Sequence, residues 1–400
     1  MDSLAEKRLL FNPSADSAIS PDVPRYLFRV VSPFSDGKTD GSWVRSMAAC
    51  QNLNSSSEDI FSRLSDEKRK RVAHTLNQHL RWWSKEGVQD NFVSWTSPLL
   101  FAIQYIYFRH LSTNDSSRLE EIKLYVIDTT LFRKRTFLRD LDLIRVFRGF
   151  DTDLKDFSKL RNTTPYYFGE YLSQRSLKIE SKHMVLSAQK LFENDRLRRS
   201  PPCFYEFHQI PIRGGKPSWP KDVIRFRKEV WLSNSSPLSR NEVYCRLEAV
   251  EEILIGLAPS WKYPLAIYFA ALTGLEAESR RLDEAGDNVL YAYFRSISLQ
   301  DAHKRFSPSN FEIFAANTMP ELEHVEKLIQ QIHAHCTLKQ ALEYIENAEV
   351  TVRNLHISNI FNARNNLPVA NYDCFAVREK IVLKLATVQM LCEEVAQAKS

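Results

Sequence analysis

Glycine is scarce in this sequence, with 10 residues in 400. Phosphate-binding loops are built from closely spaced glycines, and neither a GxGxxG nor a GxxxxGK[ST] pattern occurs in the chain. This argues against the common glycine-rich nucleotide-binding loops. A GxSxG nucleophile turn is also missing, so nucleophilic hydrolysis has no motif to support it, although it is not excluded.

Paired cysteines are absent as well, because the six cysteines are dispersed and none forms a CxxC pair. The first residues are polar and lack the apolar segment of a secretory signal peptide. We therefore expect reduced thiols in an intracellular protein of the cytoplasm or nucleus.

Long apolar runs are missing too. Residues 98–108 form an apolar run that is about half as long as a membrane-spanning helix requires. The net charge of +5 is small for the length, and basic runs such as 67–71 are explained by solvated helix faces. We expect no membrane span and no nucleic-acid surface, and the sequence leaves open which protein or small molecule serves as partner or acceptor.

Three residues of the sequence HAHC, namely His333, His335 and Cys336, have the side chains of metal ligands. Residues at positions i and i+2 of a helix do not face the same side, and no second ligand pair follows at a zinc-finger spacing. We therefore predict no metal site.

Composition and periodicity divide the chain into four parts. Residues 1–23, rich in Ser and Asp, are predicted to be a disordered arm. Residues 24–200 mix strands and helices without a repeated βαβ unit, which indicates an α+β domain. Five prolines and a Gly pair between 201 and 222 indicate a linker, and residues 223–400 show helical periodicity that predicts an all-α domain.

Local patterns predict the elements within these parts. Apolar residues at helical spacing or capping signals predict helices, over residues 65–83, 98–108, 239–257, 263–272, 320–332 and 375–398. Aromatic and β-branched runs predict strands, over residues 25–31, 92–95, 122–130, 170–179 and 183–187.

The sequence NFVSWTSPLLFAIQYIYF, residues 91–108, joins a strand to a buried helix. Ser97 is a good N-cap, and Pro98 suits the first helical position. Ser94 and Thr96 alternate with Trp95, so their hydroxyls point to the strand face opposite the indole. A helix start explains Ser97 and leaves Ser94 and Thr96 unexplained.

Two further polar residues are associated with predicted strands. Arg29 interrupts an apolar strand, where a guanidinium needs a partner or a polar cleft. Glu170 follows Gly169 and opens the strand that continues as YLSQRSLKI. Structural roles also account for them: a salt bridge for Arg29 and a turn cap for Glu170.

An arginine on a first strand, a Ser-x-Thr on a second and a glutamate on a third resemble the Arg–Ser–Glu triad of the ADP-ribosyltransferase superfamily. The sequences FVSWTSPLLFAIQYI and GEYLSQRSLKI are similar to its strand-to-helix junction and its glutamate-bearing strand. Over residues 24–272 the chain more closely resembles a fungal family of uncharacterised domains, through segments such as RYLFRVVSP, DNFVSWTS, VIDTTLF and SWKYPLA.

The superfamily resemblance implies an ADP-ribosyltransferase-like fold with a split antiparallel sheet, and NAD as the substrate. Carried over by position, Arg29 would bind a phosphate or ribose of NAD, and Ser94 would orient that arginine or the nicotinamide ribose. Glu170 would bond the ribose 2′-hydroxyl and stabilise an oxocarbenium-like transition state. The rest of the NAD site would consist of Thr96, Tyr105 and Tyr167. One of the two tyrosines would stack on nicotinamide.

The sequence also departs from that superfamily. Phe168 stands two residues before the glutamate, where arginine-modifying members often carry Gln or Glu, which weakens the case for protein-arginine targets. Trp95 replaces the usual middle Thr, and Arg175 adds a charge in the following strand. Two other functions stay open: a non-catalytic scaffold whose helical half binds a partner protein, and an accessory enzyme of fungal secondary metabolism.

Overall fold

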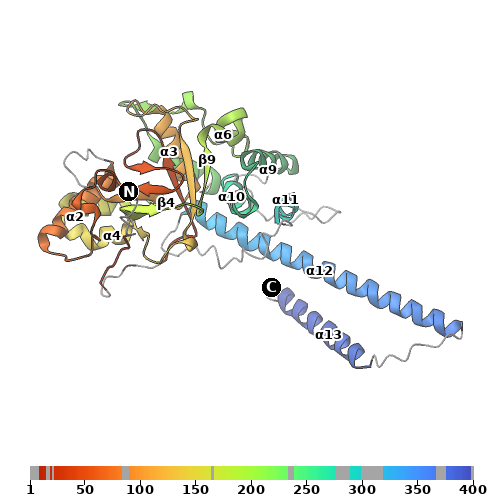
Figure 1. The fold of residues 1–400 in the computed structure, drawn as a ribbon. Helices are drawn as coiled ribbons and strands as arrows, with labels where there is room; N and C mark the ends of the chain where they lie inside the picture. The colour runs from red at the N-terminus through yellow and green to blue at the C-terminus, as the bar shows by residue number, and fades with distance from the viewer. Residues whose placement is uncertain are drawn as a thin grey trace, which may run out of the picture. The chain divides into compact units, whose positions relative to one another are not determined.

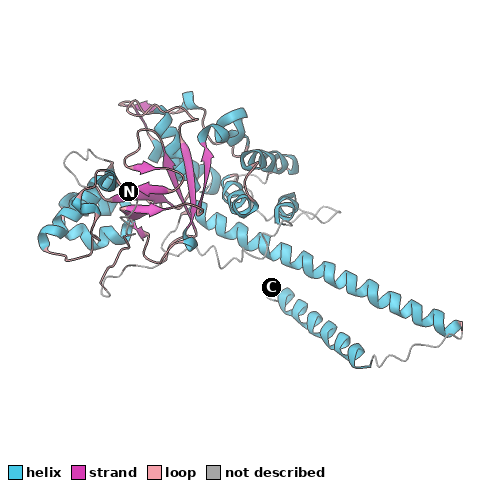
Figure 2. Cartoon of the chain, in the orientation of Figure 1, coloured by secondary structure: helices cyan, strands magenta, loops and turns pink. Residues whose placement is uncertain are grey.

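The computed structural model contains two compact units, Met1–Cys336 and Thr337–Ser400. An antiparallel sheet with helices packed around it forms the centre of the first unit (Figures 1 and 2). The structure describes residues 9–14, 19, 22–82, 90–163, 166–232, 238–274, 289–298, 319–365 and 375–397.

The main sheet has six strands in the order β6-β7-β4-β1-β5-β9, and every neighbouring pair is antiparallel. Its strands are β1 (Tyr26–Val31), β4 (Phe92–Thr96), β5 (Lys123–Asp128), β6 (Leu138–Arg139), β7 (Glu170–Gln174) and β9 (His183–Ser187). The smaller sheets contain β2 (Lys38–Thr39), β3 (Trp43–Arg45) and β8 (Ser176–Lys178), and β10 (Ile212–Arg213) with β11 (Lys216–Pro217). The predicted α+β class of the N-terminal region is confirmed.

The predicted helical character of the C-terminal region is also confirmed. The helices up to residue 200 are α1 (Met47–Cys50), α2 (Asp66–Arg81), α3 (Leu99–Leu111), α4 (Asp140–Phe147), α5 (Thr152–Arg161), α6 (Ala188–Phe192) and α7 (Arg196–Arg199). Those beyond it are α8 (Trp219–Arg227), α9 (Arg240–Leu254), α10 (Pro259–Leu272), α11 (Val289–Ser298), α12 (Pro320–Arg364) and α13 (Phe375–Gln397). None of the helices in the described ranges has the length and apolarity needed to cross a membrane.

The two faces of the main sheet are covered differently. On one face, the β1 and β5 side chains pack with α3 and α10, whereas the β4, β6 and β7 side chains pack with α2, α4 and α5. On the other face, Leu27, Trp95 and Tyr171 pack against Val44 and Leu177 of the three-stranded sheet. The helical face therefore has two apolar clusters, and β4 lies beside the boundary between them.

The join between β1 and β4 is short. β1 pairs with β5 along all six of its residues, but within the described strands it pairs with β4 only where Phe28 lies opposite Thr96. Beyond this pair the two strands have no further backbone ladder. The carbonyl group of Ser94 is thereby left for a side chain, and a gap opens in the middle of the sheet.

The predicted linker lies inside the first compact unit. Phe226 of α8 and Phe269 of α10 belong to the same apolar cluster as Phe28 of β1. Phe11, in the predicted arm, is buried, and its N–H bonds to the carbonyl oxygen of Arg135. Helices far along the sequence thus build the core that supports the sheet.

Candidate functional site

Ser94 and Glu170 are brought together by the pairing of two neighbouring strands. In the register of β4 with β7, Thr96 lies opposite Glu170 and Ser94 lies opposite Leu172. Side chains alternate along a strand, so Ser94, Thr96 and Glu170 belong to the same face of the sheet. The Ser94 hydroxyl donates a 2.6 Å hydrogen bond to Oε1 of Glu170, the short length of a bond to an ionised carboxylate. The serine therefore fixes the orientation of this carboxylate.

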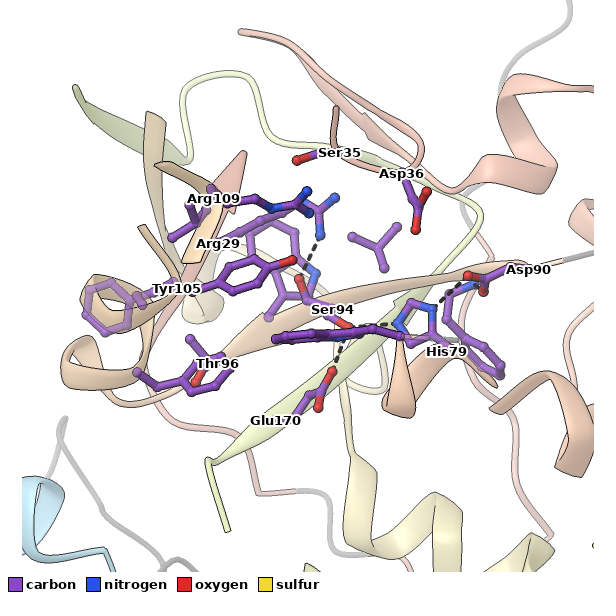
Figure 3. A pocket seen from close by; sticks show the side chains of 18 of the residues that line it. Arg29, Ser35, Asp36, His79, Asp90, Ser94, Thr96, Tyr105, Arg109 and Glu170 are labelled. Atoms are coloured by element: carbon purple, nitrogen blue, oxygen red, sulfur yellow. Dashed lines mark hydrogen bonds and ion pairs between the residues drawn. The ribbon is translucent and has the colours of Figure 1, made fainter. Parts of the chain in front are cut away.

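A histidine and an aspartate continue this line of polar groups (Figure 3). Nε2 of His79, on α2, lies 2.7 Å from Oγ of Ser94, and Nδ1 lies 2.8 Å from Oδ2 of Asp90. The Ser94 hydroxyl has one proton; when Glu170 accepts it, Nε2 of His79 must be the donor to Oγ. The His79 ring therefore connects Asp90 on one side to Ser94 on the other.

The other oxygen of the Glu170 carboxylate is held from the protein interior. Arg161, the last residue of α5, donates from Nη2 to Oε2 of Glu170 at 2.7 Å, and both side chains are more than nine-tenths buried. Nε of Arg161 also lies 3.7 Å from Oδ2 of the fully buried Asp140. Burial raises the pKa of Asp140 to about 7, against the lowering effect of Arg161 and with a further rise from the charge of Glu170. Arg161 is thus shared between two buried carboxyl groups.

Arg29 reaches the same site at the gap between β1 and β4. Its Nη1 donates to the carbonyl oxygen of Ser94 at 2.9 Å, and its Nε donates to the Thr39 hydroxyl at 3.4 Å. No carboxylate among the described residues forms an ion pair with Arg29. Burial lowers the pKa of Arg29 to about 10; Tyr105 opposes this effect and Arg109 adds to it. A desolvated guanidinium without a carboxylate partner is suited to bind an anion.

One pocket, with a volume of about 770 Å³ including its open mouth, is lined by Arg29, His79, Asp90, Ser94 and Glu170. One wall is aromatic: Phe101 and Tyr105 stack with 7° between their planes, and the Trp82 ring centroid lies 4.8 Å from that of Tyr105. Arg109 adds a second guanidinium, with its Cζ 4.9 Å from the Tyr105 ring centroid. Burial raises the pKa of Tyr105, so its hydroxyl stays protonated at neutral pH. The pocket combines cationic groups, a carboxylate and flat apolar surface.

Most residues that the sequence suggests for the site line this pocket: Arg29, Ser94, Thr96, Tyr105 and Glu170. Tyr167 does not line it. Its side chain is buried in the large apolar cluster, and its carbonyl oxygen accepts a hydrogen bond from Arg227 of α8. Tyr167 therefore supplies no stacking surface to the pocket.

Two hydroxyls at the end of β4 hold the loop that precedes β7. Thr96 Oγ1 donates to the carbonyl oxygen of Phe168 at 2.8 Å. The N–H and the hydroxyl of Ser97 donate to the carbonyl oxygen of Gly169 at 2.9 and 3.3 Å. The prediction that Ser97 caps α3 is wrong, because Pro98 occupies the N-cap position and no side chain caps this helix. Ser97 instead ties the strand end to the loop before the glutamate.

The sequence patterns did not single out His79, Asp90 or Arg161. A signal for His79 exists, since it lies three residues after Leu76 on the buried side of α2. A polar residue in the buried stripe of an amphipathic helix needs a partner, and here it has two. No periodicity marks Asp90, and Arg161 resembles the ordinary basic residues found at the ends of helices.

Comparison with known proteins finds a match to one family, whose description gives no activity. Residues 22–185 match a family described as a domain of unknown function, DUF7587. No curated protein and no solved structure matches the chain. The matched residues include the whole pocket, whereas the resemblance expected from the sequence extended to residue 272. The residues that could carry chemistry therefore lie within the matched domain.

Proposed function

We propose that the pocket binds NAD and cleaves its nicotinamide–ribose bond, as an ADP-ribosyltransferase or an NAD glycohydrolase. The observation that carries the proposal is the meeting of Arg29, Ser94 and Glu170 in one pocket, at the gap between β1 and β4. These are the residue types of the triad of the ADP-ribosyltransferase superfamily, which the sequence resembles.

Glu170 is the residue that would act on the reacting sugar. Its carboxylate would accept a hydrogen bond from the ribose 2′-hydroxyl and stabilise the positive charge that develops at C1′. The C1′–N bond breaks, its electron pair leaves with neutral nicotinamide, and water or an acceptor nucleophile bonds to C1′ and loses a proton. The Ser94 hydroxyl and Arg161 each donate to one oxygen of the carboxylate and so hold its orientation.

Arg29 would hold a phosphate group of NAD. Its guanidinium already donates to the backbone of Ser94, which fixes its position, and no described carboxylate forms an ion pair with it. A planar guanidinium donates two parallel hydrogen bonds to a phosphate, and each bond is stronger because both groups are charged. This contact would bind the substrate in the ground state and the transition state alike.

Water is the acceptor that the loop before Glu170 favours. Phe168, two residues before the glutamate, is buried and stacks on Phe101 with ring centroids 5.4 Å apart. The Arg161 and Arg227 guanidinium groups each lie 5.7 Å from its ring centroid. An apolar side chain packed in this way offers no hydrogen-bond acceptor to an arginine substrate.

The test is release of nicotinamide from NAD by the purified full chain, compared with its Glu170→Gln variant. We expect turnover by the native chain and a loss of at least about 10³-fold in the variant, because an amide cannot stabilise positive charge at C1′. Glu180→Gln is the matched control, since Glu180 is exposed and its ion pair is with Lys178, also on the surface. Absence of NAD binding in a calorimetric titration would contradict the proposal and favour the scaffold function.

The Asp90–His79–Ser94 line favours a second candidate, a serine hydrolase, because its distances match a nucleophile–base–orienter arrangement. However, the Ser94 proton is donated to Glu170, and a carboxylate 2.6 Å from Oγ would repel the oxyanion of acyl transfer. Hydrolysis of p-nitrophenyl acetate that is lost in Ser94→Ala and kept in Glu170→Gln would support this candidate over NAD cleavage.

A further inference from the structure

Trp82 follows α2 in a conformation that bulky residues seldom adopt. Its φ and ψ are 55° and 36°, the left-handed region, and its N–H bonds to the carbonyl oxygens of Gln78 and His79. Helices commonly end with glycine or asparagine in this conformation, because a Cβ strains it and the short asparagine side chain offsets the strain by local hydrogen bonding. Strained residues of this kind concentrate at binding sites. The backbone alone gives no reason for an indole here.

The indole of Trp82 contributes to the wall of the pocket. It packs on Tyr105 and Phe108 of α3, with ring centroids 4.8 and 5.6 Å away, and it remains 36% exposed. Contacts with two rings hold the indole in place and leave part of it open to solvent. A rigid, partly exposed indole is a surface on which planar rings stack.

One cationic group of the pocket, the Arg109 guanidinium, lies within reach of this indole. The Arg109 guanidinium and the Trp82 ring each lie less than 5 Å from the Tyr105 ring, so they are within about 10 Å of each other. The Arg109 charge is partly offset by Asp115, 2.8 Å away, whereas no described carboxylate pairs with Arg29. A ligand that suits this surface has a planar ring joined through a short linker to an anion, which is the chemistry of a nucleotide.

We propose that Trp82 is the stacking platform for the adenine ring of the bound nucleotide, with its diphosphate on Arg29 and Arg109. The proposal rests on the proposed function for the identity of that nucleotide. The reacting sugar would lie at Glu170, which is only 6% exposed, so the ring that meets a 36% exposed indole belongs to the outer end of the ligand. That end of NAD carries the adenine.

The test measures binding of ADP and of nicotinamide mononucleotide to the full chain by calorimetry. Trp82→Gly should weaken ADP binding about tenfold or more and leave nicotinamide mononucleotide binding within about threefold, because stacking on the indole is lost only for adenine. Trp82→Phe should keep most of the ADP affinity, since it retains a ring, and it serves if the glycine variant fails to fold. Tyr244→Ala, which removes an exposed ring on α9, is the matched control.

Three results would overturn the inference: no ADP binding by the native chain, unchanged ADP binding in both Trp82 variants, or loss confined to nicotinamide mononucleotide. ADP has no nicotinamide bond to cleave, so its binding is independent of turnover. A chain that binds ADP through Trp82 but never cleaves NAD would contradict the proposed function alone. A chain that cleaves NAD with no effect of Trp82 on ADP binding would contradict the adenine platform alone.

Discussion

Nε2 of His79 lies 2.7 Å from Oγ of Ser94, and this contact joins a helix to the strand that carries the candidate site. The histidine is itself held by Asp90 at 2.8 Å. Because the Ser94 hydroxyl is directed at Glu170, His79 acts on the carboxylate through the serine and is a positioning residue. The carboxylate is thereby held from two sides, by Ser94 and by Arg161.

Replacement of His79 tests this positioning role. In His79→Ala the Ser94 hydroxyl loses the donor that keeps its proton on the Glu170 side, so kcat for NAD cleavage should fall about 10- to 100-fold with little change in KM. His74→Ala on the same helix is the matched control, because the His74 side chain is 57% exposed and far less enclosed. An equal rise in KM with unchanged kcat would instead indicate a role in substrate binding.

The KM for NAD should depend more on the shape of the side chain at position 29 than on its charge. Lysine keeps the charge but cannot form the paired hydrogen bonds of a guanidinium. In Arg29→Lys, KM for NAD should therefore rise about tenfold or more, and in Arg29→Ala it should rise further. Steady-state kinetics with both variants measure this, and identical behaviour of the lysine variant and the native chain would show that a point charge suffices.

Gly169 is required by the turn that leads into Glu170. Its φ is +61°, and a Cβ there would lie 2.2 Å from Oγ of Ser97 and 2.9 Å from Cδ of Pro98. Gly169→Ala should lower the free energy of unfolding by at least about 1–2 kcal/mol, from the left-handed conformation alone. Urea unfolding measures the loss. Gly149→Ala is the control, since a Cβ at Gly149 meets nothing within 4 Å.

Asp140 should make the stability of the protein depend on pH. Burial raises its pKa in the folded state to about 7, above the value of an unfolded aspartate, so the folded state binds the proton more tightly. The stability that this proton contributes is complete below about pH 4 and is lost as the pH rises through 7. We therefore compare the free energy of unfolding of Asp140→Asn with that of the native chain at each pH. The variant minus native difference should be more positive at pH 8 than at pH 4.

Paired urea titrations at these two pH values test the Asp140 prediction. Asn keeps the Oδ1 that accepts the N–H of Leu141 at 2.8 Å, so the local backbone contact is preserved. Asp156→Asn is the control, because Asp156 is exposed and its ion pair with Lys159 lowers its pKa. If the difference in unfolding free energy between variant and native chain is the same at pH 4 and pH 8, the raised pKa of Asp140 is contradicted.

Much of the fold could be predicted from the sequence because its signals are local. The capping box of Ser239 and Glu242 is present at the start of α9, and the helices predicted from Pro320 and Phe375 begin at those residues. Alternation along β1, β4 and β7 follows from strand geometry and the need to bury one face. The start of α3 was misassigned, since Ser97 fits a local cap equally well but has a partner in a distant loop.

The sequence by itself determined which strands carry Arg29, Ser94 and Glu170, because strand propensity and alternation are properties of neighbouring residues. Only the tertiary structure decided that the three meet, through the register of β4 with β7 and the short join of β4 to β1. It also decided the partners that hold them, His79 on α2 and Arg161 on α5. Those contacts depend on how helices pack over a sheet, and no spacing along the chain encodes that geometry.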